Sequence, residues 1–366
     1  MTRSRHALVL ALFISVISVL LVGCGGDDDN PATTPTRGAG ALTATEAPEK
    51  PVTLRLGYFA NVTHAPAVLG VADGSFQAEL GTNVKLQTKV FNAGPAAIEA
   101  LFAGELDAAF IGPNPAINGF QKSNGQEVRI VAGAASGGAL LIVRPQANIN
   151  SATDLANKTI ATPQLGNTQD VALRSYLRKN GLKPKDNGGN VTVLPTANAD
   201  QLTLFQKGDI DGAWAPEPWA TRLMLEAGGK VFLDEKSLWP NGQFVTMQLV
   251  VSAKFLKENP KAVERLVRAE VKATQFINAN PEKARETVNK GIEQLTGKAL
   301  SKATIDGAWK NLTFTYDPIA SSLTKSARDA FDAGLLGRNE PNLKGIYQLD
   351  ILNKVLGELN LPAVSE

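Results

Sequence analysis

Leu101-Phe-Ala-Gly-Glu-Leu-Asp-Ala-Ala-Phe110 recurs about a hundred residues later as Leu204-Phe-Gln-Lys-Gly-Asp-Ile-Asp-Gly-Ala-Trp214. The shared core is a glycine, an acid, an aliphatic residue, Asp, a small residue, alanine and an aromatic residue. A Pro-x-Pro element follows each copy. Each copy predicts a helix that stops at its glycine, a short strand, a loop and the start of another helix. Independent use of common strand–helix chemistry is the alternative, but the repeat favours two similar α/β lobes.

Strand patterns alternate with helical patterns of about ten residues on both sides of the repeat. This alternation predicts a mainly parallel sheet in each lobe, with helices on its faces. Strand signals nearly vanish after residue 253, which predicts a C-terminal helical extension. Two apolar runs are the candidate crossings between lobes, near 139–144 and 247–252. We therefore expect one lobe over 51–140 plus 253–366 and the other over 145–246.

The N-terminal segment has the pattern of a signal peptide, with a short positive start and an apolar run over 7–22. It ends in Leu21-Val22-Gly23-Cys24, which resembles the bacterial lipobox. We expect residues 1–23 to be a lipoprotein signal peptide and Cys24 to carry the lipid; a plain secretory signal is the alternative. Residues 24–50 contain almost no large apolar residue and predict a flexible tether. The expected location is the outer face of a membrane, facing the periplasm or the exterior, held by the lipid alone.

Composition excludes several classes of function. Removing Arg3 and Arg5 with the signal peptide leaves 37 − 2 = 35 basic residues against 35 acidic ones, so no nucleic-acid footprint is expected. One cysteine and two histidines rule out an internal disulfide and a Cys/His metal cluster. The sequence has no phosphate-binding or dinucleotide-binding glycine motif. We expect no cofactor, no metal and no catalytic residues.

A polar loop, Ala161-Thr-Pro-Gln-Leu-Gly-Asn-Thr-Gln-Asp170, joins a predicted strand to a predicted helix. The first amides of a helix lack intrahelical partners, and the helix dipole places positive charge there. Such a loop can receive an anion. An ordinary connection capped by Asn167 or Thr168 is the alternative. In open α/β folds, loops of this kind lie along one edge of the sheet, so two facing lobes would form a cleft.

The ordered motifs resemble one family. They are Gly57-Tyr58, His64-Ala-Pro66, Asn92-Ala-Gly-Pro95 with Glu99-Ala-Leu101, Gly104 with Asp107, Asp154-Leu155, Thr159-Ile-Ala161, Gly166-Asn-Thr-Gln-Asp170 and Pro216-Glu-Pro218. Over about residues 54–256 this set resembles the nitrate/sulfonate/taurine substrate-binding proteins of ABC importers. The resemblance implies a two-lobed periplasmic-binding-protein fold (type II). It also implies a monomer that closes on a small solute and delivers it to a permease driven by an ATPase.

The resemblance further implies that the solute contacts loops that follow the strands. The residues carried over are Tyr58, His64, Asn92, Gly94, Asn114, Ser136, Gln164, Asn167, Thr168, Gln169, Trp214 and Glu217. A capped loop histidine and a core aromatic are the alternatives for His64 and Trp214. None of these residues is basic, so an anion would be held by neutral donors and helix amides. Asp170 or Glu217 would pair with an ammonium, as in taurine; structural roles are the alternative for both.

We therefore expect the extracytoplasmic binding component of an ABC importer, with a small sulfonate-type anion as its solute. Nitrate or bicarbonate, taurine and a thiamine-type pyrimidine precursor remain alternative ligands. A ligand-sensing domain and a pyrimidine-synthesis enzyme on the same fold are alternatives of another class. With one histidine in the body and a predicted export signal, the sequence favours a protein that is not an enzyme.

Overall fold

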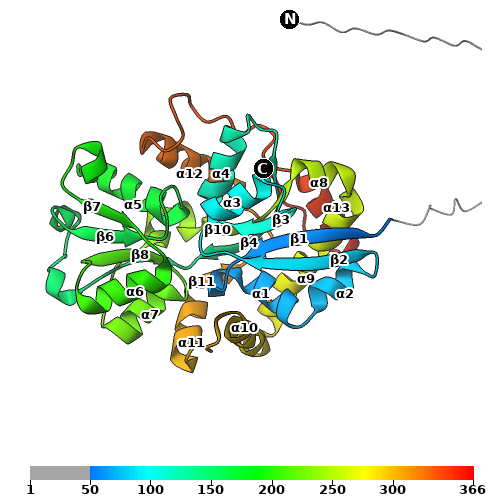
Figure 1. The fold of residues 1–366 in the computed structure, drawn as a ribbon, viewed down its shortest axis with the longest axis horizontal. Coiled ribbons are helices and arrows are strands. Elements are labelled where there is room, and N and C mark those ends of the chain that lie inside the picture. Colours follow the sequence, from blue (N-terminus) through cyan, green and yellow to red (C-terminus); the bar gives the residue numbers. More distant parts are fainter. Residues whose placement is uncertain (1–49) are drawn as a thin grey trace, which may run out of the picture. The chain divides into compact units, whose positions relative to one another are not determined.

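The computed structural model describes residues 50–366, which contain two mixed β-sheets with helices on their faces (Figure 1). The predicted signal peptide, Cys24 and the tether before residue 50 lie outside the described residues. Within 50–366, no helix combines the length and apolar character that a membrane crossing needs.

The first sheet has six strands in the order β11-β4-β10-β3-β1-β2. Strands β2, β1 and β3 run parallel, whereas β10 is antiparallel to both β3 and β4. Edge strand β11 pairs antiparallel with β4. The bounds are β1 Val52–Tyr58, β2 Val84–Val90, β3 Ala108–Ile111, β4 Val128–Gly137, β10 Val245–Ser252 and β11 Leu312–Phe314. We call this sheet and its helices the first lobe.

The second sheet has five strands in the order β7-β6-β8-β5-β9. Strands β7, β6 and β8 run parallel, and β5 is antiparallel to both β8 and β9. The bounds are β5 Ala139–Val143, β6 Thr159–Thr162, β7 Thr192–Pro195, β8 Gly212–Pro216 and β9 Lys230–Asp234. This sheet and its helices form the second lobe. Both sheets are thus mixed rather than mainly parallel, because each contains one strand laid antiparallel between two others.

Strands β5 and β10, which are antiparallel to both of their neighbours, follow the passages between the sheets. The chain leaves the first sheet at the end of β4, passes Gly138 and enters β5 directly. It returns from β9 to β10 through 235–244. The apolar runs expected to cross between lobes are therefore strands, and the passages lie just before them. The lobe boundaries drawn from the sequence stay a prediction.

Helices cover both sheets and supply most of the C-terminal third (Figure 1). The expected C-terminal helices are present, but α13 and β11 were not predicted. In α9, Pro260 starts the helix and apolar residues at helical spacing are buried on one face. The bounds are α1 Ala65–Ala72, α2 Ser75–Leu80, α3 Gly94–Phe102, α4 Pro113–Lys122, α5 Thr168–Lys179, α6 Asn198–Lys207, α7 Trp219–Ala227, α8 Ala253–Glu258, α9 Pro260–Ala279, α10 Pro281–Thr296, α11 Lys302–Lys310, α12 Ala320–Asp332 and α13 Leu349–Glu358.

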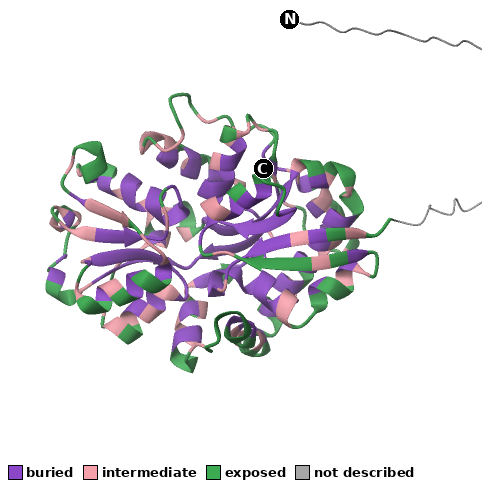
Figure 2. Cartoon of the chain, in the orientation of Figure 1, coloured by how far each residue is buried: buried purple, intermediate pink, exposed green. Residues whose placement is uncertain are grey.

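The buried residues follow the strands through the middle of both sheets (Figure 2). The first lobe has one continuous apolar cluster that joins its sheet to α1, α2, α9, α10 and α13. The second lobe has two smaller clusters. Trp214 belongs to one of them and Phe205 to the other.

The repeated Asp has the same structural role in both lobes. Asp107 accepts hydrogen bonds from the backbone N–H of Arg55 in β1 at 2.8 Å and from its guanidinium at 2.6 Å. Asp211 accepts from the backbone N–H of Thr159 in β6 at 2.9 Å and lies 3.4 Å from Arg144. Each Asp precedes the third strand of its parallel trio and binds the backbone of the central one, in the middle of β1 at Arg55 and at the start of β6 at Thr159. The repeat therefore reflects strand pairing rather than ligand chemistry.

Candidate ligand-binding site

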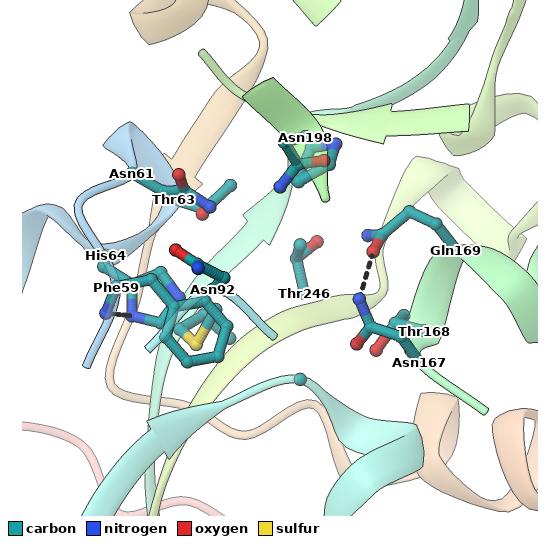
Figure 3. A pocket seen from close by; sticks show the side chains of 13 residues that line it. Phe59, Asn61, Thr63, His64, Asn92, Asn167, Thr168, Gln169, Asn198 and Thr246 are labelled. Atoms are coloured by element: carbon teal, nitrogen blue, oxygen red, sulfur yellow. Dashed lines mark hydrogen bonds between the residues drawn. The ribbon is translucent and has the colours of Figure 1, made fainter. Parts of the chain in front are cut away.

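A cavity lies between the two lobes, and we call it the interlobe cavity. Its volume is about 20 Å³. Side chains from the two lobes face each other across it (Figure 3). Its walls are formed by Phe59, Asn61, Thr63, His64, Asn92, Gly112, Asn167, Thr168, Gln169, Asn198, Pro216, Thr246 and Met247.

Five helices begin at this cavity. His64, Gly112 and Asn167 are the N-cap residues of α1, α4 and α5, and Asn198 is the first residue of α6. The fifth helix, α3, begins two residues after Asn92. No side chain caps the N-terminus of any of the five by a hydrogen bond. Prolines remove N–H groups from the first turns of α1, α3 and α4, so the free amides belong mainly to α5 and α6. These amides and the positive dipole ends of the helices favour an anion in the cavity.

His64 is fully buried at the start of α1. Burial lowers its pKa to about 3, so the imidazole is neutral at physiological pH. The backbone N–H of Phe59 donates to His64 Nδ1 at 3.3 Å, which leaves the ring proton on Nε2. Nε2 has no hydrogen-bond partner. His64 is thus a neutral donor without an acceptor on the cavity wall.

Three other buried polar atoms of the cavity wall also lack partners: Thr63 Oγ1, Thr168 Oγ1 and Asn198 Oδ1. Buried polar atoms are normally hydrogen-bonded, and leaving one unpaired costs about 1–3 kcal/mol. The two hydroxyls can each donate a hydrogen bond. Their position among helix N-termini suits a solute rich in acceptor oxygens.

The lobes approach closely at two points beside the cavity. A Cβ added at Gly112 would lie 2.3 Å from Thr168 Oγ1, so this contact across the cleft requires glycine. The indole N–H of Trp219 in α7 donates to Asn61 Oδ1 at 2.9 Å. Both contacts join the two lobes and depend on a closed cleft.

Five of the twelve residues expected to meet the ligand line the cavity: His64, Asn92, Asn167, Thr168 and Gln169. Four of the other seven lie in nearby first-lobe structure. Tyr58 is buried in the core at the end of β1, and Gly94 packs against Pro115 at the start of α4. Asn114 donates to the carbonyl of Ser326.

The other first-lobe residue, Ser136, accepts a hydrogen bond from the backbone N–H of Phe244. In the second lobe, the carbonyl of Gln164 accepts from the backbone N–H of Asn167. Trp214 is wholly buried and donates its indole N–H to Glu235 at 2.8 Å. Trp214 is therefore a core aromatic residue, which was the alternative considered for it.

The two loop acids are both buried and engaged by protein groups. Asp170 accepts from the Gly166 N–H at 2.9 Å and from Arg174 Nε at 3.1 Å. Burial raises the pKa of Asp170, and the Arg174 charge opposes that rise. Glu217 accepts from the Thr221 hydroxyl at 2.9 Å and, from the other lobe, from Asn311 Nδ2 at 2.6 Å. Burial also raises the pKa of Glu217. Neither lines the cavity.

Eight cavity residues were not anticipated: Phe59, Asn61, Thr63, Gly112, Asn198, Pro216, Thr246 and Met247. Several of these had a detectable signal, because Asn61, Thr63 and Asn198 are polar residues in short loops between a strand and a helix. Thr246 and Met247 had none. They reach the site because β10 inserts antiparallel between β3 and β4, and its first residues therefore lie at the edge where those strands end.

The chain matches known proteins over most of the described body. The model of the NMT1-like family matches residues 47–290. A Brucella abortus relative, provisionally named a binding protein, is 28% identical over 272 residues, which cover 70% of this chain and 81% of that protein. A provisionally named aliphatic sulfonates-binding protein of Escherichia coli is 29% identical over 165 residues, which are 44% of this chain and 49% of the relative.

Structural comparison confirms the two-lobed periplasmic-binding-protein fold (type II) predicted from the sequence. The alkanesulfonate-binding protein of Xanthomonas axonopodis pv. citri, solved bound to MOPS, superposes with a TM-score of 0.70. The two are 19% identical, and the match covers 82% of this chain and 100% of that one.

Proposed function

Since the chain belongs to the NMT1-like family, we propose that it is the extracytoplasmic solute-binding protein of an ABC importer. It captures a small sulfonate-type anion in the interlobe cavity and delivers it to a membrane permease. The proposal includes anchoring through a lipid on Cys24. Its relatives with binding-protein names support the importer role, and the Escherichia coli relative supports the ligand class.

The observation that carries the ligand class is the convergence of five helix N-termini, with free amides mainly at α5 and α6, on a cavity with a neutral imidazole donor. A sulfonate has three acceptor oxygens, and the donors at hand are helix amides, His64 Nε2–H and two hydroxyls. Because no lysine or arginine of residues 50–366 lines the cavity, binding rests on dipoles and neutral donors. Nitrate and bicarbonate share the same chemistry and are the nearest alternative solutes.

Two further alternatives make different demands on the site. Taurine carries an ammonium, but the carboxyls of Asp170 and Glu217 already accept hydrogen bonds from protein groups. A pyrimidine precursor would need a stacking partner, and Phe59 is the aromatic side chain on the cavity wall. We rank both below a simple sulfonate.

Thermal unfolding of the protein against ethanesulfonate, taurine, nitrate, bicarbonate and a hydroxymethylpyrimidine tests the proposal. A ligand at about 100 times its Kd stabilises the folded state by about 2.7 kcal/mol. We expect ethanesulfonate to give the largest shift, with no turnover of any compound. A response to the pyrimidine alone would refute the anion site, and turnover would refute the binding-protein role.

A matched pair of variants locates the site. Asn167→Asp keeps a good N-cap for α5 but places a negative charge on the cavity wall. It should reduce ethanesulfonate affinity at least 100-fold without lowering the melting temperature of the unliganded protein. Asn180→Asp makes the same change at the exposed far end of α5 and should leave affinity within twofold. Equal effects of the two substitutions would place the anion elsewhere.

A further inference from the structure

A second hollow lies beside the interlobe cavity, between α7 of the second lobe and the turn that joins α10 to α11. We call it the α7–α10 groove. It has a volume of about 500 Å³, and much of its wall is apolar. The apolar part of the wall includes Pro218, Trp219, Ile292, Ala299 and Leu300.

Only a thin partition separates the groove from the cavity. Phe59 and Asn61 line the cavity, whereas Ala60 between them lines the groove. In the same way, Pro216 lines the cavity and Pro218 lines the groove. The partition therefore consists of one layer of residues from each lobe.

Two side-chain contacts cross between the lobes at the partition, from Trp219 to Asn61 and from Asn311 to Glu217. Trp219 lines the groove, and its indole N–H donates to Asn61 Oδ1 of the cavity wall at 2.9 Å. The Arg222 guanidinium lies 4.5 Å from the centre of the indole ring and is itself paired with Glu226. One backbone contact, from Thr63 N–H to the Glu217 carbonyl, also crosses the partition, but it is long at 3.4 Å. Rotation of the Trp219 side chain would break its hydrogen bond to Asn61.

We propose that the α7–α10 groove receives the apolar substituent of a sulfonate whose charged head occupies the interlobe cavity, with Trp219 as the gate between them. This inference rests on the proposed function and narrows the solute class to sulfonates with an extended alkyl or aryl group. The cavity itself leaves room for little more than the head. An apolar tail gains free energy only where it leaves water, and the groove offers it aliphatic walls and an indole ring.

Titration calorimetry of the full chain with ethane-, butane- and hexanesulfonate tests the groove. Each methylene buried contributes about 0.8 kcal/mol, which is about fourfold in affinity. Since part of the tail stays hydrated, we expect affinity to rise at least tenfold from ethane- to hexanesulfonate. Ala299→Trp fills the groove from an exposed turn and should abolish this rise while leaving ethanesulfonate affinity within twofold.

Leu295→Trp is the matched control, because Leu295 is exposed on α10 outside the groove. It should keep the full rise with chain length. No rise in the wild type would overturn the proposal. A rise that survives Ala299→Trp would also overturn it, and would indicate that tails leave past the exposed Asn92 instead. Failure of ethanesulfonate itself to bind would instead refute the proposed function.

Discussion

The two sheets share one strand order over five positions, β2-β1-β3-β10-β4 in the first lobe and β7-β6-β8-β5-β9 in the second. Their surroundings differ. The first sheet is embedded in one continuous core that includes the C-terminal helices, whereas the second is flanked by two small apolar clusters. The lobes therefore share a pairing scheme but differ in how much burial supports it.

The lobes also give different chemistry to the site. The first supplies Phe59, His64 and Met247, together with polar residues, whereas the second supplies mainly short amides and hydroxyls at the starts of α5 and α6. We infer that the more extensively packed first lobe supports the cavity, whereas the second lobe mainly contributes polar groups that close over the solute. Substitutions at matched positions of the two lobes can break or sharpen this contrast.

The largest expected difference concerns the equivalent aspartates. Asp107→Ala leaves the buried N–H of Arg55 unpaired and removes its guanidinium partner, at a cost of about 3 kcal/mol of unfolding free energy. Asp211 is about a quarter exposed and its contact with Arg144 is long, so Asp211→Ala should cost about 1 kcal/mol. Urea denaturation of both variants measures the two costs. Equal losses of unfolding free energy would show that the two aspartates stabilise their lobes to the same extent, despite the difference in burial.

Each lobe also contains a buried carboxyl with a strongly raised pKa, and both should make stability depend on pH. Burial raises the pKa of Glu235 to about 7 and that of Glu270 to about 8. A carboxyl with a raised folded-state pKa stabilises the fold below its unfolded pKa, near 4.5, and that contribution is lost as pH rises through the folded value. At about 1.4 kcal/mol per pKa unit, these two shifts correspond to a fall in stability of roughly 7 kcal/mol between pH 5 and pH 9.

The two carboxyls can be separated by amide substitutions. Below pH 7 both carboxyls contribute to the decline, so either amide substitution should roughly halve its slope there. Only Glu270→Gln should also abolish the decline that continues above pH 7. Glu270 has only Thr274 as a donor, whereas two indole N–H groups support Glu235. Melting temperatures measured at several pH values report the result. Stability that rises toward pH 9 would contradict the expected direction of the pH dependence.

Closure of the lobes should depend on the absence of a side chain at Gly112. Gly112 has an ordinary helical-entry φ of −71°, so Ala fits the first lobe and meets an obstacle only in Thr168 of the second. Gly112→Ala should reduce ethanesulfonate affinity about 100-fold, or about 2.7 kcal/mol, without lowering stability. In Gly112→Ala/Thr168→Ala, affinity should return to that of Thr168→Ala. Lack of any recovery in the double variant would rule out this steric account.

The smallest expected effect comes from ion pairs that join α5 to α12 across the lobes. Lys179 lies 2.8 Å from Asp329, and Arg178 pairs with Asp332. Lys179 is half exposed, so Lys179→Ala should weaken solute binding only two- to threefold, with a shallower dependence on salt. Lys354→Ala breaks an exposed pair with Glu264 within the first lobe instead. Calorimetry at two ionic strengths should show that this control variant binds ethanesulfonate as tightly as the wild type does.

The sequence was sufficient for the fold because the repeated glycine–acid–aliphatic–Asp pattern marks the start of equivalent strands. It also indicated His64 and the 167–169 segment, since polar residues at a helix start are a local signal. It was harder to predict which residues at the end of a strand face the core and which face the cavity. β1 ends at Tyr58 with that ring in the core, so Phe59 takes the place on the cavity wall that was expected for Tyr58.

Other parts of the site depend on contacts that no local pattern encodes. Thr246 reaches the cavity through antiparallel pairing of β10 with strands more than a hundred residues earlier. Trp214 and Glu217 satisfied the rule that ligands meet loops after strands, yet both are taken up by internal hydrogen bonds. Pairing of distant strands and capture of loop side chains by the core both require three-dimensional information.

The central claim is that a neutral His64 donates from Nε2 to a bound anion. Nitrogen-15 NMR of histidine-labelled protein measures this directly, since the chain has only two histidines and a His64→Gln variant assigns the signals. We expect a neutral ring protonated at Nε2 from pH 5 to pH 8, with its Nε2–H proton moving downfield when ethanesulfonate binds. A charged imidazolium in this range, or an Nε2–H signal unchanged by saturating ethanesulfonate, would contradict the account.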